Sequence, residues 1–111
     1  MSYVPDRGDV VWLDCSPQVG REQAGRRPTL VLAPARYNGR VGLAVVCPIT
    51  NKAKGFPFEV VIPDGFSVTG VILSDQAKSI DWQGRDAEYR ETLPEEVVAA
   101  VVERFSSLIQ L

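Results

Sequence analysis

The sequence contains no histidine among its 111 residues. It therefore lacks the usual general base of neutral pH, the usual proton shuttle and the commonest nitrogen ligand of metal ions. Its two cysteines, Cys15 and Cys47, are too few for a disulfide framework and do not have the spacing of a metal site. Both lie in apolar surroundings, which favours small buried residues over reactive thiols. The sequence predicts no metal site and no cofactor.

Long apolar segments and targeting signals are also missing. No apolar run approaches the roughly 20 residues that are needed to span a bilayer. The first residues, MSYVPDRGD, lack the charged and then apolar regions of a secretory signal. We therefore expect a cytoplasmic protein that does not enter a membrane. Its length and its apolar fraction of 45% predict a single domain, residues 1–111.

Short apolar runs separated by turn-forming residues predict a mainly β protein. The sequence Tyr37-Asn38-Gly39 is expected to form a turn. Six short strands at this spacing are typical of a small closed barrel. The expected strands cover residues 9–14, 29–33, 43–49, 56–62, 70–75 and 77–82.

The last segment has the periodicity of a helix instead. Thr92 and Glu95 have the spacing of a capping box, and Pro94 suits a first helical turn. The apolar residues beyond them form one stripe, which must pack on the barrel or on a second subunit. The stripe consists of Val97, Val98, Val101, Val102, Phe105, Leu108 and Ile109.

The net charge of −2 conceals a difference between the two halves of the chain. Residues 1–54 contain eight Lys and Arg against four acids, which gives +4, whereas residues 55–111 contain four against ten, which gives −6. A basic half indicates an anionic partner.

Arg27 is the first candidate for a functional side chain. It lies between a charged loop and an apolar run, directly before Pro28, which restricts the backbone of the residue that precedes it. A guanidinium held at the start of a strand is a planar fork of donors that suits phosphate. Glu22, a few residues upstream, is close enough to orient the arginine or to accept a proton. A surface ion pair without function is the alternative interpretation.

Thr50 is the second candidate, because it follows an apolar strand and begins a second basic loop, Asn51–Gly55. If the two strands pair antiparallel, the start of one lies beside the end of the other, so Arg27 and Thr50 converge. Together they would hold a phosphate and the charge that builds on it during transfer. A threonine in this position is otherwise a common turn residue.

These motifs, taken together, resemble the MazF/PemK family of toxin endoribonucleases. The resemblance runs through most of the chain, and its residues occur in the order and spacing of the family. They are Tyr3-Val-Pro-Asp6 with Gly8-Asp9, Glu22-Gln-Ala-Gly25 with Arg27-Pro28, Pro48 with Thr50, Lys54-Gly55 with Pro57-Phe-Glu-Val60, and Asp75-Gln76 with Lys78-Ser79-Ile80.

The resemblance implies a small SH3-like (PemK/CcdB-like) β-barrel with an appended C-terminal helix, which acts as a homodimer. It implies sequence-specific cleavage of single-stranded RNA without a metal, and inhibition by a cognate antitoxin. The catalytic arginine and threonine of the family fall on Arg27 and Thr50, and the family's glutamate falls on Glu22. Contacts to RNA are expected from the basic loops and the later motif, at Arg21, Gln23, Arg26, Asn51, Lys52, Lys54, Gln76 and Lys78. The antitoxin is expected to be MazE-like and acidic, and to contact Trp12, Arg21 and Arg26.

The 2′-hydroxyl of RNA can serve as the nucleophile, so the protein has only to position it, stabilise charge and move protons. Arginine stays protonated in proteins and is a poor base, which favours Glu22 for proton removal. The family is nevertheless described with the arginine in that role, and both alternatives stay open.

Two other functions compete with RNA cleavage. One is a non-catalytic poison of a protein target, like the gyrase-poisoning CcdB toxins. Those toxins use an aromatic residue near the chain end, where this chain has Ser-Ser-Leu-Ile-Gln-Leu. The other is a barrel that binds RNA without cutting it. The presence of both Arg27 and Thr50 favours the enzyme.

Overall fold

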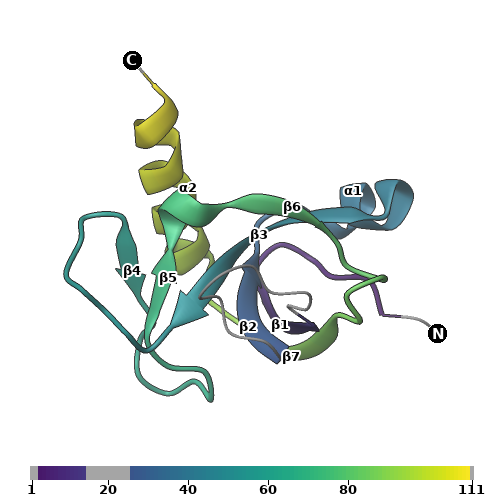
Figure 1. Ribbon diagram of the computed structural model, residues 1–111, viewed down its shortest axis with the longest axis horizontal. Coiled ribbons are helices and arrows are strands. Elements are labelled where there is room, and N and C mark those ends of the chain that lie inside the picture. Colours follow the sequence, from purple (N-terminus) through teal and green to yellow (C-terminus); the bar gives the residue numbers. More distant parts are fainter. Residues whose placement is uncertain (1–2, 15–25, 111) are drawn as a thin grey trace, which may run out of the picture.

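The computed structural model describes residues 3–14 and 26–110. Within these residues lie a seven-stranded sheet, two α-helices and one short 3₁₀ helix (Figure 1). In chain order they are β1 (Asp9–Asp14), β2 (Arg26–Val31), α1 (Ala35–Val41), β3 (Leu43–Thr50), β4 (Glu59–Val61), β5 (Val71–Leu73), η1 (Ser74–Gln76), β6 (Lys78–Asp81), β7 (Glu88–Thr92) and α2 (Glu95–Ile109).

The sheet is antiparallel, and β3 is its central strand. The strand order is β4-β5-β3-β2-β1-β7, and β6 also pairs with β3. The first half of β3 lies beside β6, and its last two residues, Ile49 and Thr50, lie beside β5. At Val46, β3 pairs with β2 on one edge and with β6 on the other.

The sheet does not close into a barrel. Within the described residues β4 and β7, at the two ends of the strand order, do not pair with each other. Instead, the carboxylate of Glu91 in β7 accepts the backbone N–H groups of Ser67 and Val68, which lie between β4 and β5, and this links the two ends of the sheet. The predicted mainly β class with a C-terminal helix is confirmed, and the predicted closure is wrong.

Both faces of the central strands are buried. Alternate residues such as Val10, Leu30 and Cys47 belong to one apolar cluster, which also contains Val98 and Val101 of α2. The residues between them form a second cluster on the opposite face, namely Val11, Leu13, Val31, Ala44 and Val46, with Ile80 and Trp82. Because side chains alternate between the faces of a strand, burial on both faces explains why these strands are continuous apolar runs.

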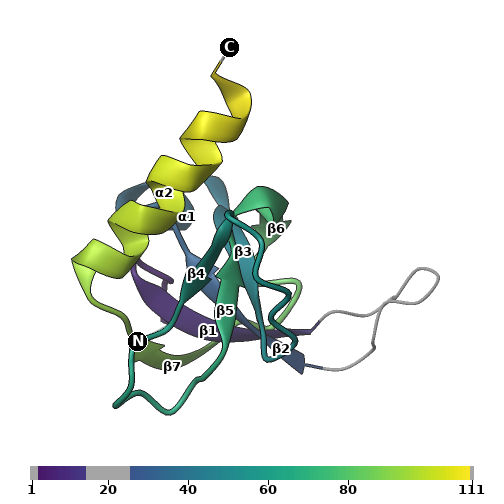
Figure 2. The same cartoon turned by 90° about the vertical axis from the view of Figure 1, so that its left-hand side faces the viewer.

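The predicted helix is confirmed as α2, which lies along one side of the sheet (Figure 2). Its first half packs into the core, whereas its C-terminal end projects from the body and exposes Leu108 and Ile109. The predicted capping box is wrong. The N-cap is Pro94, while Thr92 ends β7 and donates to Asp9 Oδ1, and Glu95 pairs with Arg7 at 2.8 Å. No helix in the described part of the chain is long and apolar enough to cross a bilayer.

The predicted turn at Tyr37-Asn38-Gly39 is wrong, because these residues lie inside α1. Asn38 is fully buried, and its amide group donates to the carbonyl oxygens of Pro5 and Ala33 at 2.8 Å. The backbone carbonyl oxygen of Asn38 accepts the indole N–H of Trp82 at 2.9 Å. These bonds, of which those to Pro5 and Trp82 are long-range, outweigh the local preference of Asn-Gly for a turn.

The strand boundaries differ from prediction at several places. β2 begins at Arg26 rather than Thr29, and the strand expected over 70–75 ends at Leu73, where η1 begins. The strands expected over 56–62 and 77–82 are shorter, as β4 and β6. No strand was expected at β7, because this edge strand is mostly exposed and polar, and among the described strands it pairs with β1 alone.

Candidate functional site

Arg27 and Thr50 lie at adjacent strand ends. The β2–β3 ladder ends at the pair Thr29 and Pro48, and Arg27 and Thr50 each lie two residues further along. Pro28 has no N–H with which to continue the ladder, which is a physical reason for the strands to part here. Arg27 is the second residue of β2 rather than the residue before a strand that begins at Thr29, and it pairs with Leu13 of β1. The predicted antiparallel pairing of the two strands is confirmed.

Two hollows of about 320 Å³ each meet at this point, and Arg27, Ile49, Thr50 and Lys52 line both of them. The first, called here the basic hollow, is also lined by Gln76, Lys78 and Arg85. Among the described residues, four cationic side chains thus line it, and Asp14 supplies the one carboxylate. A concave surface with this excess of positive charge attracts polyanions.

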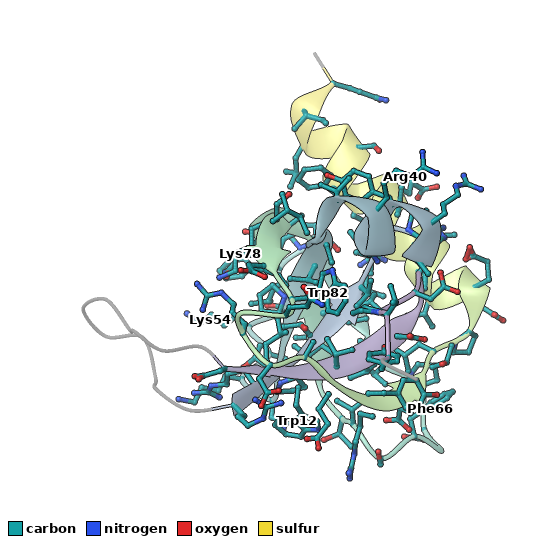
Figure 3. The ribbon with its side chains drawn as sticks, turned by 90° about the vertical axis from the view of Figure 1, so that its right-hand side faces the viewer. Trp12, Arg40, Lys54, Phe66, Lys78 and Trp82 are labelled. Carbon is teal, nitrogen blue, oxygen red and sulfur yellow. The ribbon has the colours of Figure 1, made fainter. Side chains whose placement is uncertain are left out.

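The second hollow, called here the tryptophan hollow, contains the half-buried Trp12. Its other lining residues include Asn51 and the segment Ser67–Thr69. An aromatic ring beside amide and hydroxyl groups is a suitable environment for a nucleobase, which both stacks and forms hydrogen bonds. Figure 3 shows Trp12 on the lower part of the molecule and Lys78 and Lys54 together on one side.

The Thr50 side chain is held in place by a local bond. Its oxygen accepts the backbone N–H of Lys52 at 3.1 Å. A hydroxyl that accepts one bond in this way still has its own proton to donate. Arg27 is half-buried, and no hydrogen bond or ion pair joins its guanidinium to another of the described residues. The two groups are therefore both able to donate into the same space.

A family described as PemK-like, MazF-like toxin of type II toxin–antitoxin systems matches residues 6–109. The endoribonuclease toxin MazF of Escherichia coli K12 is 44% identical over 107 residues, which are 96% of each chain. The chain belongs to the PemK/MazF toxin family. A further member, the endoribonuclease PemK of Escherichia coli, is 34% identical over 108 residues, which are 94% of this chain and 81% of PemK.

Solved structures of the MazF family agree with this assignment over the whole fold. The crystal structure of MazF from Deinococcus radiodurans matches with a TM-score of 0.91 and 50% identity, over 99% of this chain and 100% of that one. A MazE–MazF crystal structure from the same organism matches with a TM-score of 0.89 and 45% identity, over 99% of both chains.

The hollows of this MazF-family chain contain only part of the predicted site. Asn51, Lys52, Gln76 and Lys78 line them, as do Arg26 and Trp12. Lys54 lines neither hollow, and its backbone N–H donates to the Glu59 carboxylate. The predicted residues Arg21, Glu22 and Gln23 lie outside the described residues.

Arg26 has a structural role that the sequence did not indicate. Its guanidinium donates to the carbonyl oxygens of Trp12 and Asp86, at 3.0 and 2.6 Å. It also lies 3.6 Å from the Asp86 carboxylate and 3.8 Å from that of Glu88. Arg26 thus ties the start of β2 to the connection between β6 and β7.

Sequence reasoning missed Arg85 and the segment Ser67–Thr69. Arg85 reaches the basic hollow from the β6–β7 connection, where its guanidinium donates to the Asp14 carbonyl oxygen at 3.1 Å. It comes from the acidic half of the chain, so the charge pattern did not indicate it.

Within residues 3–14 and 26–110, no three acidic, cysteine or histidine side chains lie together as the ligands of a metal ion would.

Proposed function

We propose that this protein is a toxin that cuts single-stranded RNA at short specific sequences, with Arg27 and Thr50 as its catalytic residues. The observation that supports it most is that a guanidinium and a hydroxyl from two adjacent strand ends line the same two hollows. Endoribonuclease activity is the function of the named relatives MazF and PemK. Lys52, Lys78 and Arg85 supply the positive charge that a bound RNA backbone requires.

The nucleophile in this proposal is the 2′-hydroxyl of the RNA itself. Its oxygen attacks the adjacent phosphorus, and the bond from phosphorus to the 5′-oxygen of the next nucleotide breaks. The products are a 2′,3′-cyclic phosphate and a 5′-hydroxyl. The Arg27 fork donates to the phosphate oxygens, and the Thr50 hydroxyl donates to one of them as negative charge builds up in the transition state.

Two proton transfers accompany the reaction, because the 2′-oxygen loses a proton and the 5′-oxygen gains one. Glu22 and Arg27 are the two candidates for accepting the first proton. A Glu22→Gln protein distinguishes them. If Glu22 is the base, the Gln protein is slower at every pH, and the fall in rate that protonation of the base causes at low pH disappears from the pH–rate profile. If Arg27 is the base, the pH–rate profile of the Gln protein keeps its fall at low pH.

An acidic, MazE-like antitoxin is the proposed protein partner, supported by the MazE–MazF structures of relatives. An acidic segment that lies in the basic hollow would compete with RNA for the same cations, so its affinity falls as salt rises. The half-buried ring of Trp12 provides an apolar contact for such a segment, beside the predicted contacts Arg21 and Arg26. Cleavage of RNA and its control are proposed to take place in the cytoplasm.

A homodimer is also part of the proposal. The C-terminal end of α2 exposes Leu108 and Ile109, which are 52% and 67% accessible. This end lies beside the segment that carries the stacked rings of Phe56 and Phe58, since Arg104 donates to the Pro57 carbonyl oxygen. A second copy would cover this apolar surface.

The test uses one long single-stranded RNA and its matched analogue with 2′-deoxy nucleotides at the cleavage positions. We expect cleavage of the RNA with and without a chelator, a cyclic phosphate product, and no cleavage at the deoxy positions. An intact RNA that does not bind would favour the CcdB-like alternative. Bound but intact RNA would favour the non-catalytic barrel. Cutting at a deoxy position would rule out the 2′-hydroxyl mechanism.

A further inference from the structure

Ser67, Val68 and Thr69, between β4 and β5, line the tryptophan hollow, and together with Gly70 they form the segment called here the wall. The hydroxyl of Thr69 donates to Oδ1 of Asn51 at 2.9 Å. Gly70 lies against the backbone of Thr50, so closely that a Cβ there would be 2.2 Å from the Thr50 carbonyl oxygen. The wall therefore contacts the catalytic threonine and also the residue that follows it.

Glu91 of β7 holds this wall from the opposite end of the sheet. Its Oε1 accepts the Ser67 backbone N–H at 3.0 Å. Its Oε2 accepts the Val68 N–H at 2.7 Å and the Ser67 hydroxyl at 2.9 Å. Arg90 adds a bond from Nε to the Ser67 hydroxyl oxygen at 3.2 Å. One carboxylate thus satisfies three donors of the wall.

The ionisation of Glu91 agrees with this arrangement. Burial by itself raises the pKa of the Glu91 carboxyl, but the hydrogen bonds from the Ser67 and Val68 backbone outweigh it and hold the pKa below its ordinary value. The wall therefore binds the charged carboxylate, and bonds to an ionised acceptor are stronger than bonds to a neutral one. An amide at this position would lose the charge and one of the two acceptor oxygens.

We propose that Glu91 is a positioning residue that fixes Asn51 as the reader of one nucleobase beside the scissile phosphate. The proposal rests on RNA cleavage at Arg27 and Thr50. The Thr69 hydroxyl donates to the amide oxygen of Asn51 and thereby fixes the orientation of the amide, so that the two N–H donors of its NH₂ group have a defined direction. We expect the base that these donors select to present an acceptor, a carbonyl oxygen or a ring nitrogen. Trp12, in the same hollow, provides a surface for stacking.

The test compares Glu91→Gln with Glu103→Gln, which removes the same charge from an exposed position on α2. The substrates are four RNAs that differ only in the nucleotide beside the cleaved bond. We expect Glu91→Gln to lower the preference between best and worst nucleotide by about fivefold, the effect of one positioned hydrogen bond. In Glu91→Gln the kcat on the preferred RNA falls by a smaller factor than the nucleotide preference does, because Arg27 and Thr50 are intact. Glu103→Gln keeps the wild-type preference.

A double-mutant cycle identifies the route of the effect. If Glu91 acts through Asn51, then Asn51→Ala lowers the preference by itself and adding Glu91→Gln lowers it little further. Independent effects of the two substitutions would overturn the proposal, as would an unchanged preference in Glu91→Gln. A second measurement does not depend on cleavage. Hydrogen exchange at the Ser67 and Val68 amides should be faster in Glu91→Gln than in Glu103→Gln, and equal rates would also overturn the proposal.

Failure of this inference can be told from failure of the proposed function. A wild-type protein that cuts none of the four RNAs would contradict the proposed function itself. A wild-type protein that cuts them with a preference that Glu91→Gln leaves intact contradicts only the role of Glu91. Ser67→Ala removes one of the three donors and should give a smaller loss of preference than Glu91→Gln.

Discussion

The Cα of Gly70 lies so close to Thr50 that no other residue fits at that position. A Cβ would be 2.2 Å from the Thr50 carbonyl oxygen and 2.9 Å from Oδ1 of Asn51, and the glycine has a φ of +109°. Both the contact and the backbone angle require glycine. The position of the proposed catalytic threonine thus depends on a residue 20 positions further along the chain.

We expect Gly70→Ala to displace Thr50 and to lower the cleavage rate by about 10²-fold, the effect of a misplacement of about 1 Å at a reacting centre. Gly65→Ala is the matched control, because Gly65 also has a positive φ, +102°, but its Cβ would meet nothing within 4 Å. Both variants lose about 1 kcal/mol of unfolding free energy from the positive φ, and Gly65→Ala keeps its activity. Equal activity of the two folded proteins would contradict the role of the contact.

Arg27→Ala should lower the cleavage rate by about 10² to 10³, the usual loss for one preorganised donor. Arg27→Lys should recover little of it, because a single ammonium cannot replace the two parallel donors of the guanidinium. Single-turnover rates on one RNA measure both effects. A folded Arg27→Ala protein that cuts RNA at the wild-type rate would remove Arg27 from the mechanism.

The homodimer can be tested at the C-terminal end of α2. Sedimentation of the wild-type protein at micromolar concentration should give about twice the mass of a chain of 12.2 kDa. Leu108→Arg should shift the mass towards that of one chain, because a buried unpaired charge opposes association. Val41→Arg makes the same change on α1, at a side chain of similar accessibility, 49%, and should remain a dimer. A dimer that tolerates Leu108→Arg would place the interface elsewhere.

Cys47 should resist alkylation in the folded protein. Burial, with a smaller contribution from the negative charge of Asp75, raises the pKa of the Cys47 thiol to about 12. Because the thiolate is the reactive form, its fraction at pH 8.5 is far lower in the folded than in the unfolded chain. Mass spectrometry of peptides after brief treatment with iodoacetamide should therefore find Cys47 modified only after denaturant is added. Modification of the native protein at the rate of the denatured one would contradict this burial.

The sequence by itself determined the mainly β class, three long elements and the two residues at the centre of the proposed site. The runs Asp9–Asp14 and Leu43–Thr50 and the helical stripe of Glu95–Ile109 are long enough to carry a clear period or a continuous apolar pattern. Arg27 could be found because it precedes Pro28 at the start of one apolar run, and Thr50 because it follows another, and antiparallel pairing brings such ends together.

Only the tertiary structure decided the elements whose local sequence was neutral or pointed elsewhere. Asn38 lies in a helix rather than a turn because its amide bonds to Pro5 and its backbone carbonyl to Trp82. Thr92 ends a strand rather than capping a helix because Asp9 accepts its hydroxyl. The wall at Ser67–Gly70 is held by Glu91, more than 20 residues away. Each of these outcomes depends on hydrogen bonds between residues distant in the chain, which no local period or propensity can encode.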